Sequence, residues 1–84
     1  MMVKIFWRQG CPKCPAAKEL SKKLSNSNVN VKIYNLEDID GLSEGTLFGV
    51  MSTPATIVVD DKNKEVASWR GETPSESEIK KHII

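Results

Sequence analysis

Apolar and polar positions in the first 34 residues follow three patterns in turn. Residues 3–7 are mostly apolar and partly β-branched or aromatic, which is typical of a buried strand. Residues 12–25 place Leu20 and Leu24 on one helical face, with the lysines mostly off it. Residues 29–34 alternate apolar and polar side chains, which is the period of a second strand. Together these patterns predict a βαβ unit whose parallel strands are joined by a right-handed crossover.

The pattern in the middle of the chain is weaker. Residues 37–50 carry apolar side chains at roughly helical spacing, but glycines interrupt them, so we expect a short and loosely specified helix. Residues 55–59 are a third apolar strand, and residues 60–63 are rich in turn formers. Residues 64–69 are therefore expected to return as the antiparallel partner in a hairpin.

The end of the chain predicts a closing helix. Thr73 is the expected N-cap, with Pro74 at the first helical position and Glu76 at the third. Ile79 and Ile83 then lie on the inner face of this helix. The element order is βαβαββα, which describes a small α/β domain.

Length and composition fit one globular domain. A chain of 84 residues is too short for two average domains, so we expect residues 1–84 to fold as one. A content of 39% hydrophobic and 27% charged residues argues against disorder. The net charge of +1 argues against a nucleic-acid or membrane-surface binder that relies on bulk charge. No aromatic residue interleaves Lys18, Lys22 and Lys23, so we interpret them as a solvated helix face.

The two cysteines are too few for a disulfide-rich secreted scaffold. Residues 1–8 lack the long apolar stretch and cleavage site of a signal peptide, and no run of apolar residues is long enough for a transmembrane helix. We therefore expect a soluble cytoplasmic protein. Thiols are kept reduced there, so a cysteine pair is more often catalytic, redox-active or metal-binding than structural.

Cys11 and Cys14 lie between the first predicted strand and the first predicted helix. Free N–H groups and the positive dipole end of a helix stabilise a thiolate, and the thiolate is the attacking species in disulfide exchange. We therefore expect Cys11 to be the nucleophile, with Lys13 adding positive charge nearby. Cys14 comes one turn later and is the expected resolving thiol. Pro12 suits the first helical turn, whereas Pro15 cannot donate to the Cys11 carbonyl and predicts an irregular turn.

A zinc site is the alternative for this pair. Structural zinc takes four ligands, and His82 is the only other strong nitrogen or sulfur candidate in the sequence. A monomeric site would need His82 and a carboxylate to converge on the cysteines. A CxxC pair at a strand-to-helix junction of a βαβ unit is instead a thioredoxin-like redox signal.

Four features stand out along the chain: Phe6-Trp7, Cys11-Pro12-Lys13-Cys14, Thr53-Pro54 and Gly71 before the last helix. Together they resemble the thioredoxin/glutaredoxin superfamily over nearly the whole chain. The resemblance implies a thioredoxin fold, with a four-stranded mixed sheet flanked by about three helices. It also implies that Pro54 is cis and lies beside the cysteine pair, where the Thr53 backbone would pair with a bound peptide or glutathione.

Thioredoxin-like and glutaredoxin-like features are mixed. The size and the CPxC motif resemble glutaredoxins, while Phe6-Trp7 and the hairpin sequence resemble thioredoxins. The Gly-Gly that helps to hold glutathione in glutaredoxins is absent, because Arg70 and Glu72 flank Gly71. The buried acid that thioredoxins carry six residues before the first cysteine is replaced by Ile5.

The resemblance implies a dithiol–disulfide oxidoreductase that reduces or exchanges protein disulfides. It would need no bound cofactor and no metal, because the redox-active group is the Cys11–Cys14 disulfide. The expected partners are disulfide-containing proteins and a reductase, with electrons from a thioredoxin-reductase-type enzyme or from glutathione. We expect a monomer that binds neither nucleic acid nor membrane. A glutathione-dependent glutaredoxin and a small zinc-binding interaction module are the alternatives. Supporting roles at the active site are expected for Pro12, Lys13, Thr53 and Pro54, and substrate-binding roles for Trp7, Met51 and Thr53.

Overall fold

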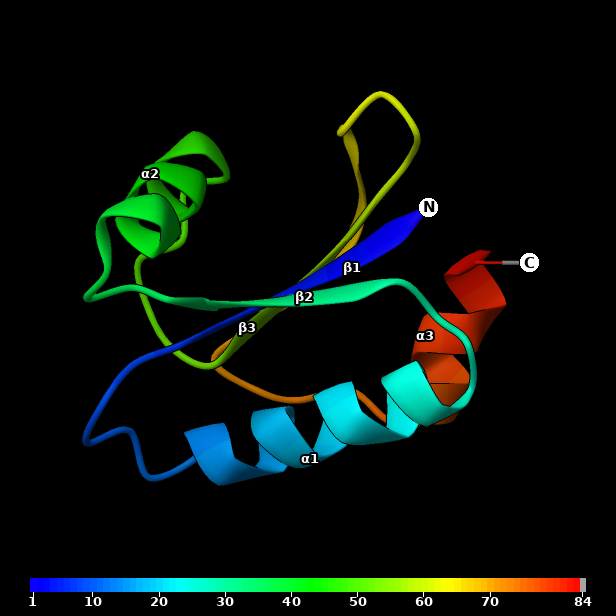
Figure 1. The fold of residues 1–84 in the computed structure, drawn as a ribbon, viewed down its shortest axis with the longest axis horizontal. Coiled ribbons are helices and arrows are strands. Elements are labelled where there is room, and N and C mark those ends of the chain that lie inside the picture. The colour runs from blue at the N-terminus through cyan, green and yellow to red at the C-terminus, as the bar shows by residue number, and fades with distance from the viewer. Residues whose placement is uncertain (84) are drawn as a thin grey trace.

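A single mixed sheet organises the computed structural model, which describes residues 1–83 (Figure 1). The strand order is β2-β1-β3-β4, with β1 parallel to β2 and antiparallel to β3, and with β3 antiparallel to β4. This arrangement confirms the expected four-stranded mixed sheet with three helices. The elements are β1 (Met2–Trp7), α1 (Cys14–Asn26), β2 (Val31–Asn35), α2 (Ile39–Leu47), β3 (Ala55–Val59), β4 (Glu65–Arg70) and α3 (Glu76–Ile83).

The helices cover both faces of the sheet. Helices α1 and α3 lie on one face, and α2 lies on the other (Figure 1). Alternation along β1 sends Val3 and Ile5 toward α1 and α3, and sends Phe6 toward α2. Each face therefore has a small core of its own. The core under α1 and α3 contains Val3, Ile5, Ala17, Leu20, Leu24, Val58 and Ile79, and the core under α2 contains Phe6, Tyr34, Ala55, Ile57 and Val59.

The first helix begins later than the sequence pattern predicts. Helix α1 starts at Cys14, whereas the pattern indicated a start at Pro12. Pro15 explains the delay, because it has no N–H to donate to the Cys11 carbonyl and so has to occupy the first helical turn. Pro15 therefore takes the role that was assigned to Pro12, and Cys11 lies in a turn ahead of the helix.

The cap of the last helix is also displaced, by two residues. Helix α3 begins at Glu76, and the Glu78 amide donates to Ser75 Oγ at 3.1 Å. The N-cap is therefore Ser75, and the assignment of Thr73 was wrong. The Thr73-Pro74 and Ser75-Glu76 signals are adjacent in the sequence, so both could mark the start of this helix. Thr73 Oγ1 is buried and makes no hydrogen bond within the described residues, so Thr73 does not cap the helix. Ile79 is fully buried, as the inner-face prediction requires.

Helix α2 turns its glycines toward the sheet. Gly41 and Gly45 are buried, while Ile39, Leu42 and Leu47 are 84%, 59% and 66% exposed. A side chain at Gly41 would collide with the backbone of Asn35 at the end of β2. The helix lies close against the end of β2 because these positions lack side chains. Its large apolar residues therefore face outward.

A part-buried ion pair joins α2 to the sheet. Lys4 Nζ lies 2.8 Å from Glu44 Oε2, and the two side chains are only 6% and 27% exposed. The Lys4 ammonium also lies 5.0 Å from the centroid of the Phe48 ring and 5.8 Å from that of Tyr34. Charged groups removed from water need such partners. Replacing either Lys4 or Glu44 alone should therefore destabilise the fold, because the other charge would be left without its partner.

Replacing Glu44 by glutamine should lower the free energy of unfolding by about 3 kcal/mol, because Lys4 would remain buried without a counter-charge. The double variant Lys4→Met with Glu44→Gln should recover most of that loss. Urea denaturation curves measure both changes. Glu65→Gln is the matched control, because its pair with Arg70 is 35–38% exposed and should contribute at most about 1 kcal/mol. Equal losses from Glu44→Gln and Glu65→Gln would contradict the buried-pair interpretation.

Candidate active site

The two cysteines are joined at the junction of β1 and α1. Cys11 and Cys14 form a disulfide, with their Cα atoms 5.4 Å apart. The Cys14 amide donates to the Cys11 carbonyl at 3.3 Å, which closes the turn before the helix. Cys14 is only 2% exposed, whereas Cys11 is half-buried. The more accessible cysteine is therefore the one outside the helix.

A cis proline lies at the same edge of the sheet. The register between β1 and β3 pairs Phe6 with Ala55, so Trp7, the last residue of β1, and Pro54, which directly precedes β3, lie at the same end of the sheet. The Thr53–Pro54 peptide is cis, which confirms the expectation from the resemblance. The Pro54 carbonyl accepts a hydrogen bond of 2.9 Å from the Gly71 amide. The loops that follow β1, precede β3 and follow β4 therefore meet at this edge.

A shallow hollow adjoins the disulfide. Its volume is about 290 Å³, and Lys18 and Arg8 border it together with both cysteines. Lys18 Nζ lies 3.5 Å from the centroid of the Trp7 ring, close enough for a cation–π interaction. The interpretation of Lys18 as part of a solvated face is therefore incomplete. The sequence did hold a signal for the place of Lys18 beside the cysteines. Lys18 follows Cys14 by four residues, and this spacing places both side chains on one helical face.

A carboxylate from the segment before α2 holds the loop before Cys11. The Gln9 amide donates to Glu37 Oε1 at 3.2 Å, which links this loop to the segment between β2 and α2. Ile5, at the position of the missing acid, is fully buried. The sequence did not indicate the contact between Gln9 and Glu37, because 28 residues separate its partners.

Comparison with known proteins decides the family. The family model described as "Thioredoxin domain" matches residues 1–84. This chain belongs to the thioredoxin family. A search of curated proteins finds no match.

Solved structures of the thioredoxin fold superpose on nearly the whole chain. Thioredoxin 1 from Thermosipho africanus TCF52B has a TM-score of 0.74 at 20% identity, covering 99% of this chain and 90% of its own. A malarial protein has a TM-score of 0.78 at 22% identity, covering 99% of this chain and 97% of its own. A thioredoxin-fold protein from Helicobacter pylori has a TM-score of 0.67 at 18% identity, with coverages of 87% and 60%. At these identities the likeness establishes the fold.

The other predicted site residues of this thioredoxin-family chain differ in accessibility. Pro12 and Lys13 are exposed in the turn between the cysteines, and Lys13 occupies the N-cap position of α1 without a side-chain capping bond. Met51 is 95% exposed in the loop that leads to the cis proline. Thr53 is half-buried and Pro54 is buried.

The described residues offer no metal site and no membrane span. Across residues 1–83, no group of three or more His, Cys, Asp and Glu side chains is placed to hold a metal ion. His82 lies instead against Trp69, with their ring centroids 5.7 Å apart. No helix in this part of the chain is both long and apolar enough to cross a membrane.

Proposed function

We propose that this thioredoxin-family chain is a thiol–disulfide oxidoreductase that reduces or exchanges disulfides in other proteins. The observation that carries the proposal is the Cys11–Cys14 disulfide, whose two cysteines differ in exposure at the start of α1. A cis Pro54 at the same edge of the sheet supports it, because the Thr53 backbone beside it makes no hydrogen bond within residues 1–83 and could pair with an extended substrate.

The reaction begins from the reduced pair. The Cys11 thiolate attacks one sulfur of a substrate disulfide, and the other substrate sulfur leaves as a thiolate that takes up a proton. This step forms a mixed disulfide between Cys11 and the substrate. The Cys14 thiolate then attacks Cys11 Sγ, which breaks the mixed disulfide and releases the second substrate thiol. Two electrons have passed to the substrate, and the enzyme holds the Cys11–Cys14 disulfide seen in the structure.

Positive charge and aromatic surface border the sulfur that attacks. Lys18 and Arg8 favour the thiolate over the thiol by their charge. Trp7 presents a ring beside them on which an apolar substrate side chain can pack. Pro12, Lys13 and Met51 complete the exposed rim that a protein substrate would meet.

The electron donor we favour is a thioredoxin-reductase-type enzyme. The second glycine of a glutathione site is replaced by Glu72, an exposed carboxylate that would repel the carboxylates of glutathione. The Gly71 amide is already bonded to the Pro54 carbonyl, so it is not free to bind a ligand carboxylate. In this proposal the protein acts in the cytoplasm as a monomer.

Two coupled assays in parallel test the donor. Reduction of insulin disulfides should proceed faster with NADPH and thioredoxin reductase than with NADPH, glutathione and glutathione reductase. Glu72→Gly tests the reason, because it should raise the glutathione-dependent rate and leave the other rate nearly unchanged. Faster turnover with glutathione in the unmodified protein would identify a glutaredoxin. Stoichiometric zinc released by a thiol-blocking reagent, with no turnover in either assay, would identify a zinc module.

A further inference from the structure

Positive charge is concentrated in the segment that carries both cysteines. Residues 8–18 contain Arg8, Lys13 and Lys18 and no acidic residue. The whole chain has a net charge of only +1, so the remaining residues are together net negative. The cations beside the disulfide are therefore a local feature, and the overall charge of the protein does not account for them.

Two of these cations border the hollow beside the disulfide. Arg8 and Lys18 line it together with Cys11 and Cys14, and no acidic residue of the described chain does. Arg8 lies in the loop after β1, and Lys18 lies on α1. A group held in this hollow therefore meets positive charge from both of the segments that meet at the disulfide.

These cations have no carboxylate partner in the chain itself. Arg8, Lys13 and Lys18 form no ion pair within residues 1–83. Lys18 lies over the Trp7 ring instead, and an aromatic ring leaves the positive charge of the ammonium uncompensated. Glu37 is bonded to the loop before Cys11, but it accepts from a backbone amide and does not line the hollow.

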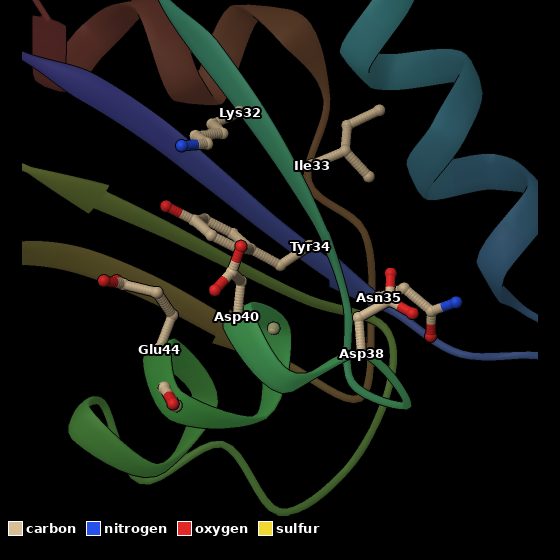
Figure 2. A pocket seen from close by; sticks show the side chains of 9 residues that line it. Lys32, Ile33, Tyr34, Asn35, Asp38, Asp40 and Glu44 are labelled. Carbon is tan, nitrogen blue, oxygen red and sulfur yellow. The ribbon is translucent and has the colours of Figure 1, made fainter.

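The hollow between β2 and α2 has the opposite arrangement (Figure 2). Asp38, Asp40 and Glu44 share that hollow with Lys32, and Glu44 is also paired with Lys4. The carboxylates there lie beside cations of the chain itself. The cations beside the disulfide have no such partners, so an anionic group from another molecule is what their hollow complements.

The chemistry of the first attack indicates where that anionic group belongs. A carboxylate next to a target disulfide repels an approaching thiolate, because the two groups have like charge. Arg8 and Lys18 offset this repulsion at Cys11 and add an attraction of their own. Glu72 does not line the hollow. It follows Gly71, whose amide is bonded at the cis-proline edge, so its repulsion acts there.

We propose that Arg8 and Lys18 select protein disulfides in which an aspartate or glutamate lies next to the cysteine that is attacked. This inference rests on the proposed oxidoreductase function and names the substrate class of the same site. The guanidinium of Arg8 and the ammonium of Lys18 donate to the substrate carboxylate. That carboxylate keeps its charge throughout, and the bonds made and broken remain those of the disulfide exchange. Lys13, exposed between the cysteines, adds attraction as the substrate approaches.

Single-turnover reduction of three matched peptides tests the proposal. Each peptide is closed by one disulfide, and the residues that flank both cysteines are aspartate in the first, asparagine in the second and lysine in the third. Protein that has been reduced beforehand and freed of reductant should reduce the aspartate peptide about tenfold faster than the lysine peptide at low ionic strength. Added salt should shrink this ratio. Mercaptoethanol, a thiol without neighbouring cations, should instead react more slowly with the aspartate peptide.

Variants of the two cations locate the preference. Arg8→Gln and Lys18→Gln should each lower the ratio of the aspartate rate to the lysine rate about threefold, and Lys18→Glu should lower it further. The ratio is the readout because a smaller thiolate fraction slows both peptides alike. The controls are Lys22→Gln, an exposed cation four residues further along α1, and Lys64→Gln, an exposed cation before β4. Both controls should keep the ratio, and thermal unfolding verifies that all five variants fold.

Three results would overturn the proposed substrate class and leave the oxidoreductase function intact. The first is an equal rate with the aspartate and lysine peptides, and the second is an equal loss of preference in the variants and the controls. The third is stronger inhibition by inorganic phosphate than by chloride at equal ionic strength, which would identify a site for a small free anion. Reduction of none of the three peptides would overturn the oxidoreductase function itself, and the substrate class with it.

Discussion

Replacing Cys11 by serine should lower the rate of protein disulfide reduction by a factor on the order of 10³ or more, because a serine hydroxyl stays un-ionised at neutral pH and forms no mixed disulfide. Cys11 is the accessible member of the pair, so no other sulfur can take over the first attack. The coupled insulin assay measures the loss. Thermal unfolding under reducing conditions, compared with the reduced unmodified protein, shows that the loss is chemical.

Cys14→Ser is the matched partner of this variant. The first attack by Cys11 should survive, but the mixed disulfide should persist because no second thiol resolves it. Mass spectrometry and non-reducing electrophoresis should therefore detect a covalent complex with substrate for Cys14→Ser and none for Cys11→Ser. Full turnover by Cys14→Ser would show that the two roles are assigned wrongly.

Replacing Gly41 by alanine should lower the free energy of unfolding by about 3 kcal/mol, which is at the upper end of the usual cost of overpacking. The added Cβ would collide with the carbonyl group of Asn35, and a backbone group cannot rotate away as a side chain can. Helix α2 would have to move, which would also strain the Lys4–Glu44 pair. Helix propensity favours alanine by only about 1 kcal/mol, so the collision should prevail. Urea denaturation measures the net change.

Gly45→Ala is the control variant, because Gly45 also faces the sheet from α2 but its added Cβ would meet a side chain instead of the backbone. Its Cβ would lie 2.6 Å from Leu36 Cδ2, which is the end of a flexible side chain. Leu36 can rotate, so the loss should be smaller, at about 1 kcal/mol or less. An unchanged or increased stability of Gly41→Ala would show that α2 moves freely and that propensity prevails.

Local signals predicted the parts of the fold whose neighbours in space are also neighbours in sequence. The apolar run in residues 3–7, the helical face of residues 12–25 and the alternation in residues 29–34 identify the βαβ unit that the structure shows. Helix boundaries were less accurate, because two candidate signals for the first turn competed at α1 and at α3. Pro15 prevailed over Pro12 at α1, and Ser75 prevailed over Thr73 at α3.

The middle segment shows where a periodic pattern misleads. Ile39, Leu42 and Leu47 have helical spacing, which usually marks a buried face. Their exposure follows from Gly41 and Gly45, which let the opposite face of α2 approach the sheet more closely. Apolar spacing identifies a helix, but only the packing decides which of its faces is buried.

The sequence by itself determined the family features of this protein: two cysteines three residues apart after a strand, a later Thr53–Pro54, and the order of helices and strands. Only the tertiary structure decided the long-range electrostatics. Lys4 and Glu44 are 40 residues apart, and Gln9 and Glu37 are 28 apart. The spacing of a motif involves residues that are near one another in the chain, so it can be read from the sequence. An ion pair or a hydrogen bond between distant residues depends on how the chain folds back, and no local pattern records it.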